Sequence, residues 1–150
     1  MRTRTLTLTL GILTVAALAV PTAAKAPAGR FATTADTAAD AATKLVWQRS
    51  TWPALHDWKG AWAACDVSDL AGKTDWRLPT ARELESILDL GETSPAVDTA
   101  VFVNCKPAKY WTASDVVGTK QYFVVDFSNG MVLTHLGTEI AAYVRCVRGP

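Results

Sequence analysis

Three cysteines are the most reactive side chains in this 150-residue sequence: Cys65, Cys105 and Cys146. An odd number allows at most one disulfide within the chain and leaves one thiol over. No two of them have the Cys-x-x-Cys spacing of a zinc site or a thioredoxin-like redox pair. Cys105 is followed by Lys106 and Lys109, whose positive charges favour a reactive thiolate. If Cys105 is the cysteine left over, it lacks the partner that catalysis needs, and we expect it to be an unpaired thiol on or near the surface.

The two histidines do not form a metal-binding pattern. His56 and His135 are separated by most of the chain, whereas a zinc site needs three or four ligands brought together. The sequence also shows no cluster of a nucleophile, a base and an orienting acid, which is the arrangement of hydrolytic enzymes. We therefore expect no metal, no cofactor and no catalytic residues, so that the protein is not an enzyme.

Lysines and aromatic residues in and around two irregular stretches favour a ligand-binding role. Residues 92–109 and 115–120 are predicted to be long loops, and loops on a rigid scaffold commonly carry binding sites. Aromatic rings beside lysines suit sugars and sulfated glycans, because rings pack on apolar sugar faces and cations attract sulfates. Trp52, in the loop before the first predicted helix, is the first choice for an exposed platform. The residues predicted to bind a ligand are Lys106, Lys109, Lys120, Tyr110, Trp111 and Trp52.

The first 24 residues read as a secretory signal peptide. Arg2 and Arg4 form a basic start, residues 6–20 are mostly apolar, and small residues precede a cleavage site after Ala24, with Ala26 as the alternative. The apolar run is short for a membrane span. We expect an exported protein, periplasmic or secreted, with no membrane span after cleavage.

The mature chain is expected to be one domain over residues 29–150, preceded by a short leader at 25–28. Removing residues 1–24 takes away two arginines and leaves 13 Lys and Arg against 14 Asp and Glu, a net charge of −1. A nearly neutral domain is a poor general binder of polyanions, so no nucleic-acid partner is expected. The partners that remain are a glycan or an envelope protein, and the oligomeric state is left open.

Two helices and several strands must position these residues. Thr80 and Glu83 form the Thr-x-x-Glu pattern of a capping box, followed by apolar residues at helical spacing up to Leu88. An earlier helix is predicted from Trp58 to Cys65, because apolar residues recur at i, i+3, i+4 and i+7. Residues rich in aromatic and β-branched side chains predict strands at 44–49, 110–114, 121–127, 131–135 and 142–148.

Four of these segments share a signature with one bacterial family. The segments are Leu-Val-Trp-Gln at 45–48, Asp-Trp-Arg-Leu-Pro-Thr at 75–80, Tyr-Trp-Thr-Ala-Ser at 110–114 and Tyr-Val-Arg-Cys-Val-Arg at 143–148. In this order they resemble the Lcl C-terminal domain family, found at the C-terminus of bacterial collagen-like adhesins. That family is related to the C-type lectin fold and more distantly to the formylglycine-generating enzymes that modify sulfatases. No Gly-x-y repeat is present, so the collagen-like stalk of those adhesins is missing.

The resemblance covers residues 29–150 and implies a fold. The fold expected is α+β and C-type lectin-like, with two helices packed on a mainly antiparallel sheet and long loops. Lectin-like domains tie their first helix to their last strand, which implies a Cys65–Cys146 disulfide, with two separate buried thiols as the alternative. Asp126 and Asn129 lie near a lectin calcium-ligand pair, but the companion Glu-Pro-Asn or Gln-Pro-Asp motif is missing, so calcium binding is not expected.

The function expected is a non-enzymatic binding or adhesion module for a glycan or protein ligand. Two alternatives stay open: an enzyme distantly related to the formylglycine-generating factors, and a domain that only stabilises the envelope. Two arginines of the shared motifs also have structural interpretations. We expect Arg77 to pair with Asp75 or with backbone carbonyls, and Arg145 to point outward from an edge strand, where charge blocks aggregation.

Overall fold

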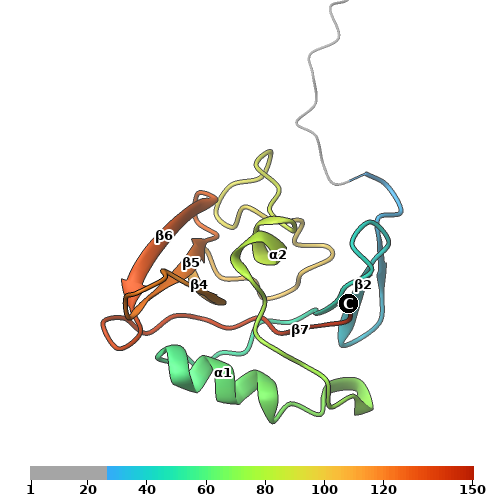
Figure 1. Ribbon diagram of the computed structural model, residues 1–150. Coiled ribbons are helices and arrows are strands. Elements are labelled where there is room, and N and C mark those ends of the chain that lie inside the picture. Colours follow the sequence, from blue (N-terminus) through green and yellow to red (C-terminus); the bar gives the residue numbers. More distant parts are fainter. Residues whose placement is uncertain (1–26) are drawn as a thin grey trace, which may run out of the picture.

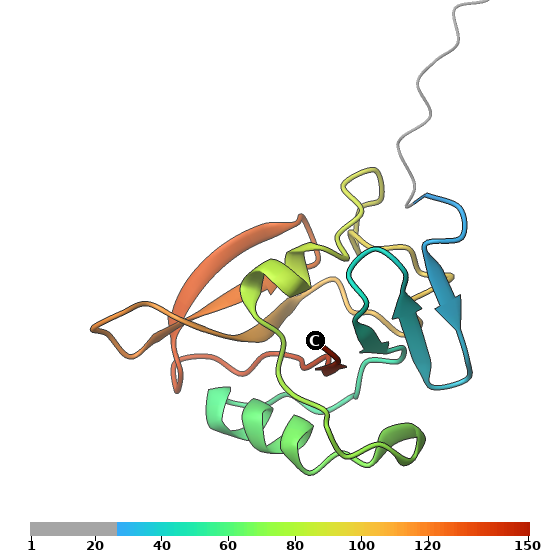
Figure 2. The ribbon, with the colours of Figure 1, turned by 45° about the vertical axis from the view of Figure 1, so that its right-hand side comes forward.

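The computed structural model describes residues 27–150, so the predicted signal peptide and the first two residues of the leader lie outside the described residues. The chain forms two separate antiparallel sheets and two short α-helices. Figure 1 shows the sheets on opposite sides of the molecule, with α2 between them and α1 along one edge. Figure 2 shows the same separation after a turn of the molecule. Among residues 27–150, no helix is both long and apolar enough to cross a membrane.

The first sheet has four strands in the order β1-β2-β3-β7. Its strands are β1 (Phe31–Thr33), β2 (Thr37–Asp40), β3 (Val46–Gln48) and β7 (Val147–Arg148). The alanine- and threonine-rich segment before β3 forms the hairpin β1–β2, held by the ion pair between Arg30 and Asp40 at 2.7 Å. Strand β3 is covered on both faces, because both Trp47 and Gln48 are buried.

The second sheet has three strands in the order β4-β5-β6. Its strands are β4 (Lys109–Asp115), β5 (Gln121–Asp126) and β6 (Met131–Leu136). Successive side chains of a strand point to opposite faces, and here each face meets its own core. Val125 lies in the cluster that contains Leu84 of α2, while its neighbour Val124 lies in the cluster that contains Ala61 of α1.

The expected α+β, C-type lectin-like fold is wrong, because the structure is mainly β. Helix α1 spans Trp58–Asp66, and α2 spans only Ala81–Glu85. The second helix begins at the predicted capping box but ends early. The hydroxyl of Ser86 donates to the carbonyl of Glu83 at 2.6 Å. The amides of Ile87 and Leu88 then donate to carbonyls only three residues earlier, as in a turn. Apolar side chains expected on a longer helix therefore reach the core from a turn.

The corner between Trp76 and α2 holds the capping box and an ion pair. The amide of Glu83 donates to Thr80 Oγ1 at 3.2 Å, and Glu83 Oε2 accepts from the amide of Thr80 at 2.7 Å. Arg77 donates to both carboxylate oxygens of Glu83, at 2.8 and 2.7 Å. Of the two kinds of partner expected for Arg77, Asp75 is wrong, because it accepts from Arg148 at 2.7 Å. The other is found, because the backbone carbonyl of Pro150 accepts from Arg77 at 3.4 Å.

The C-terminal segment is tied into the molecule by a disulfide and a buried arginine. Cys65 of α1 is bonded to Cys146, as expected, and Cys105 is left free. The predicted strand at 142–148 shortens to β7. Arg145 does not point outward: it is completely buried and donates to the carbonyls of Gln48 and Arg49 at 2.7 and 2.8 Å.

Candidate binding site

The predicted aromatic platform is not available to a ligand. Tyr110 and Trp111 of β4 are both completely buried. Trp111 is enclosed because its backbone amide donates to the carbonyl of Tyr143 and its indole N–H donates to the carbonyl of His56, at 3.0 and 2.8 Å. The C-terminal segment and the residues before α1 thus cover β4. Neither ring is exposed, so the two cannot form the predicted binding surface.

The three predicted lysines do not gather into one patch. Lys109 begins β4 and lies opposite Asp126, whereas Lys120 lies in the turn at the other end of the β4–β5 hairpin. At about 3.4 Å per residue, the two ends of this hairpin are roughly 20 Å apart. Lys106 lies in the loop before β4, where its amide donates to the hydroxyl of Tyr110 at 2.8 Å. Trp52 is half-buried and lines a different hollow beside α1.

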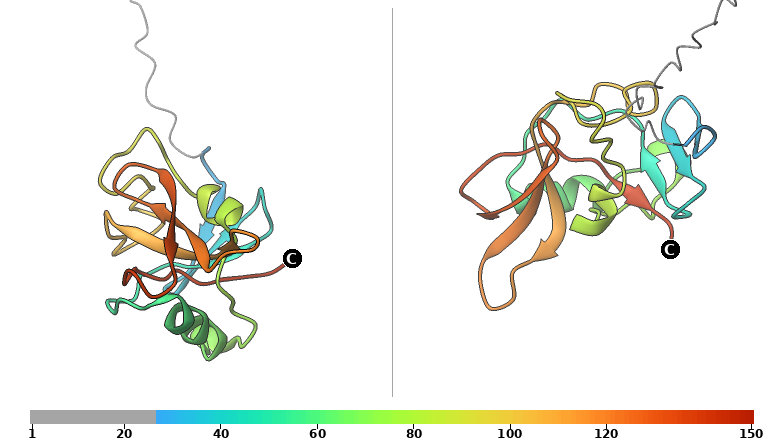
Figure 3. Two further views of the ribbon diagram at one scale, coloured as in Figure 1. Left: turned by 60° about the vertical axis from the view of Figure 1, so that its left-hand side comes forward. Right: turned by 90° about the horizontal axis from the view of Figure 1, so that it is seen from above.

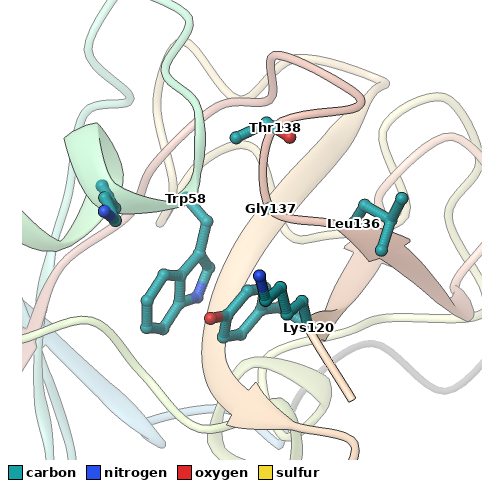
Figure 4. A pocket seen from close by; sticks show the side chains of 7 residues that line it. Trp58, Lys120, Leu136, Gly137 and Thr138 are labelled. Carbon is teal, nitrogen blue, oxygen red and sulfur yellow. The ribbon is translucent and has the colours of Figure 1, made fainter.

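A pocket of about 440 Å³ opens where the start of α1, the β4–β5 turn and the end of β6 meet. Figure 4 shows Trp58 and Leu136 on opposite sides of it, with Gly137 and Lys120 between them. The lining residues are Trp58, Lys59, Lys120, Tyr122, Leu136, Gly137 and Thr138. Of the sequence-predicted site residues, Lys120 alone lies here.

Helix capping and backbone bonds place Trp58 in the pocket wall. Asp57 begins α1, and its carboxylate accepts from the amide of Gly60 at 2.7 Å. The amide of Trp58 donates to the carbonyl of Gly137 at 3.0 Å, and the indole N–H donates to the carbonyl of Thr112 at 2.9 Å. These two bonds fix the tryptophan to both the β4 strand and the loop after β6, so its orientation is set by the fold.

Tyr122 of β5 stacks on Trp58 and completes an aromatic wall. The two rings are nearly parallel, with a centroid distance of 3.7 Å and an angle of 14°. Gly137 permits this arrangement, because a Cβ atom there would lie 2.8 Å from Cε2 of Tyr122 and 3.2 Å from Cβ of Trp58. The stacked pair is therefore rigid and half-exposed, which suits a flat or apolar ligand surface.

The charges around the pocket are positive. Lys59 and Lys120 are both exposed, and in the part of the chain that the structure describes neither forms a salt bridge. None of the lining residues is acidic. Leu136 adds an apolar side chain that is 46% exposed. The pocket thus combines aromatic and apolar walls with two cations free to meet an anionic group.

The model of the Lcl C-terminal domain family matches residues 36–148, which is most of the chain. The protein belongs to this family. A comparison with curated proteins found no match. Membership is consistent with a binding or adhesion module. The Cys65–Cys146 disulfide of this Lcl C-terminal domain is compatible with an extracellular or periplasmic location, because such bonds persist in oxidising compartments.

The free cysteine of this Lcl C-terminal domain lies in a polar network of its own. Cys105 Sγ is 3.5 Å from the hydroxyl of Tyr110, which also lies 3.0 Å from Thr51 Oγ1. Burial raises the pKa of the Tyr110 hydroxyl far above its usual value, so it stays protonated and cannot act as a base at neutral pH. Within residues 27–150, no group of three or more His, Cys, Asp or Glu side chains could hold a metal ion.

Sequence reasoning missed most of the pocket of this Lcl C-terminal domain. Trp58 was assigned to the apolar stripe of its helix and Tyr122 to a strand, both correctly. The stripe itself is only partly covered, because Ala61 and Cys65 are buried while Trp62 is 40% exposed. The cap at Asp57 places Trp58 at the start of α1, but this signal does not show that the side chain is half-exposed. Nothing local in the sequence pairs it with Tyr122.

Proposed function

We propose that this domain is an exported, non-enzymatic binding module that holds a saccharide in the pocket lined by Trp58 and Tyr122. The observation that carries the proposal is the half-exposed, stacked aromatic pair flanked by two lysines without acidic partners. Sugar rings present apolar C–H faces that pack on aromatic rings, and their hydroxyl, carboxylate or sulfate groups can meet the ammonium groups of Lys59 and Lys120.

The shape of the site favours a small ligand group over a flat protein surface. Its volume of about 440 Å³ lies in the range of small-molecule pockets, roughly 300–1,000 Å³. Two exposed lysines favour anionic sugars over neutral ones. Because both cations are solvated and the domain is nearly neutral, we expect an affinity on the order of micromolar or weaker that falls with added salt.

The surroundings of the free thiol, Cys105, support binding without a catalytic step. The formylglycine-generating relatives imply a pair of cysteines, but Cys65 and Cys146 are bonded to each other, which leaves Cys105 without a companion. The neighbouring Tyr110 stays protonated, so it cannot supply a base. These features support binding without turnover.

The lysines are tested by calorimetric titration of sulfated, carboxylated and neutral oligosaccharides at low and physiological salt. Changing Lys59 and Lys120 together to glutamine is expected to weaken binding of anionic sugars about tenfold, because two ionic contacts are lost. The matched control changes Lys106 and Lys109 to glutamine, which alters the net charge equally in the originally predicted loop. Equal losses in both variants would mean a general charge effect, and a loss in the control alone would place the site in that loop.

The aromatic wall is tested separately by Gly137→Ala. The new methyl group would lie 2.8 Å from the Tyr122 ring and must displace it from Trp58. Binding of neutral and anionic sugars should weaken together, with circular dichroism confirming an intact fold. Full binding by this variant would exclude the stacked pair. A protein that binds no glycan in any of these titrations would have a protein ligand instead.

A further inference from the structure

Strand β6 leaves one edge of the three-stranded sheet open. It pairs with β5 over its whole length, from Met131 opposite Asp126 to Leu136 opposite Gln121. In Figures 1 and 2, β6 forms the outer border of the molecule on the side away from the four-stranded sheet. The view from above in Figure 3 places the hairpin of β5 and β6 at the same periphery.

The other sheet edges are short or occupied. Strand β1 has only three residues. Strand β4 exchanges two hydrogen bonds with Tyr143, through the amide of Trp111 at 3.0 Å and the carbonyl of Lys109 at 3.0 Å. Val147 of β7 exchanges two bonds with Arg77, at 2.8 and 2.9 Å. Among the described residues, β6 is therefore the one long edge that nothing covers.

The register identifies the backbone groups that point outward from β6. The amide of Gly137 donates to the carbonyl of Lys120 at 3.3 Å, so residues of β6 with odd numbers face β5 and those with even numbers face away. Leu136 is satisfied, because Glu139 accepts from its amide and donates to its carbonyl. The amides and carbonyls of Val132 and Thr134 have no partner within residues 27–150.

The chemistry of β6 does not protect this edge. Soluble monomers usually block a long edge with lysine, proline or a bulge. The sequence Met-Val-Leu-Thr-His-Leu contains no Lys, Arg, Asp, Glu or Pro, and its register with β5 is unbroken. Such a strand is a template for pairing with another strand.

We propose that β6 pairs antiparallel with β6 of a second copy of this chain, giving a continuous six-stranded sheet across a two-fold axis at Leu133. This register places Val132 of each copy opposite Thr134 of the other. The amide and carbonyl of Val132 then bond to the carbonyl and amide of Thr134 of the other copy, and the same exchange occurs in reverse. These four hydrogen bonds satisfy every outward backbone group of both residues. The edge is thus complementary to itself, as an isologous interface requires.

The side chains around the edge fit the same register. Leu136 of one copy falls beside Gly130 of the other, where Leu90 lies so close that a Cβ atom at Gly130 would be 2.5 Å from its Cδ2. Leu136 and Leu90 are 46% and 74% exposed in the single chain. Pairing would bring these apolar side chains together and remove them from water, and no formal charge lies within the paired strands. Leu136 also lines the pocket, but the pairing of the backbone groups requires no ligand there.

Sedimentation of the protein expressed from the full-length sequence tests the pairing. A small interface of four backbone bonds predicts a dimer with a dissociation constant on the order of micromolar or weaker. The expected result is a monomer at low concentration, about twice that mass at high concentration, and slower amide exchange at Val132 and Thr134 in the dimer. A protein that is still monomeric at about 1 mM would overturn the proposal. Its dissociation constant would then exceed about 1 mM, which is too weak for a specific interface between two strands.

Thr134→Pro separates pairing from folding. Its amide faces away from β5, so proline removes no bond of the single chain but deletes a donor of the proposed interface. The variant should remain folded and monomeric, and the matched control Thr134→Val should still dimerise. If the proline variant unfolds, Thr134→Lys serves instead, because this exposed side chain can carry a charge into the interface without disturbing the core.

Three results would contradict the proposal. A dimer that persists in the folded Thr134→Pro or Thr134→Lys variant uses another surface. Slow exchange at Val132 and Thr134 in a dilute monomer would show that another segment of the same chain covers the edge. Association that appears only with a different added protein would assign the edge to that partner.

Discussion

Arg145 shows how one buried residue joins distant parts of this domain. Its guanidinium is completely buried and lies over the ring of Phe102 at 5.0 Å. It donates to two carbonyls at the end of β3 and to Thr51 Oγ1, at distances between 2.6 and 2.8 Å. None of its hydrogen-bond partners among residues 27–150 is a carboxylate, so hydrogen bonds and ring contacts must offset the cost of burying the charge.

We predict that Arg145→Lys lowers the free energy of unfolding by about 3 kcal/mol. Lysine keeps the charge but cannot reproduce the planar fork, so carbonyl groups lose their donors in a buried site. Urea unfolding measures the change. Arg148→Lys is the matched control, because its pair with the half-exposed Asp75 lies at the surface, and it should change stability by less than about 1 kcal/mol. Equal effects at both positions would refute a special role for Arg145.

At the scale of elements, the corner before α2 concentrates several interactions on one carboxylate. Glu83 accepts from the amide of Thr80 and from both terminal nitrogens of Arg77. Burial alone would raise the pKa of Glu83, but the hydrogen bonds from Arg77 and Thr80 outweigh it and hold the pKa below its usual value. The capping box and the ion pair therefore depend on the same ionised group.

This lowered pKa predicts a pH dependence of stability. A carboxyl with a lower pKa in the folded state contributes stability above its unfolded pKa of about 4.3 and loses it as the pH falls through the folded value. Urea unfolding between pH 6 and pH 3 should show a smaller loss for Glu83→Gln than for the original protein. Thr80→Ala keeps the ion pair and the backbone amide bond to Glu83, so it should cost about 1 kcal/mol and retain most of the pH dependence. An unchanged profile in Glu83→Gln would contradict this account.

On the scale of the whole molecule, the disulfide ties α1 to the segment that ends in the four-stranded sheet. Cys65 and Cys146 are 81 residues apart in sequence and both are buried. The bond encloses β4, β5, β6 and α2 within one closed loop. Closing so long a loop restricts the unfolded chain strongly, by up to about 4–5 kcal/mol in the chain-entropy treatment.

We predict that replacing both Cys65 and Cys146 with alanine lowers the free energy of unfolding by up to about 4–5 kcal/mol. The original protein should lose similar stability when reduced, whereas the double variant should not respond to reductant. Cys105→Ala, which leaves the bridge intact, should keep the full response. Non-reducing peptide mapping should recover a linked 65–146 peptide, and a bridge through Cys105 would contradict the structure.

The sequence by itself determined the features that depend on neighbours along the chain. The capping box at Thr80, the start of α1 and strands β4 to β6 follow from short patterns of caps, spacing and β-branched residues, and the shared motifs identified the family. These signals act over a few residues, so they survive whatever the chain packs against. The predicted α2 is too long. Ile87 and Leu88 have helical spacing, but they pack into the core from the turn that follows the helix.

Only the tertiary structure decided which side chains face water and which meet. The sequence led us to expect Tyr110 and Trp111 to contact a ligand and Arg145 to point outward, but segments far along the chain cover all three. The pocket forms because α1, the β4–β5 turn and the end of β6 converge, with Gly137 allowing Tyr122 to approach Trp58. Such contacts depend on how separate elements pack, and no pattern of neighbouring residues shows which distant side chains will meet.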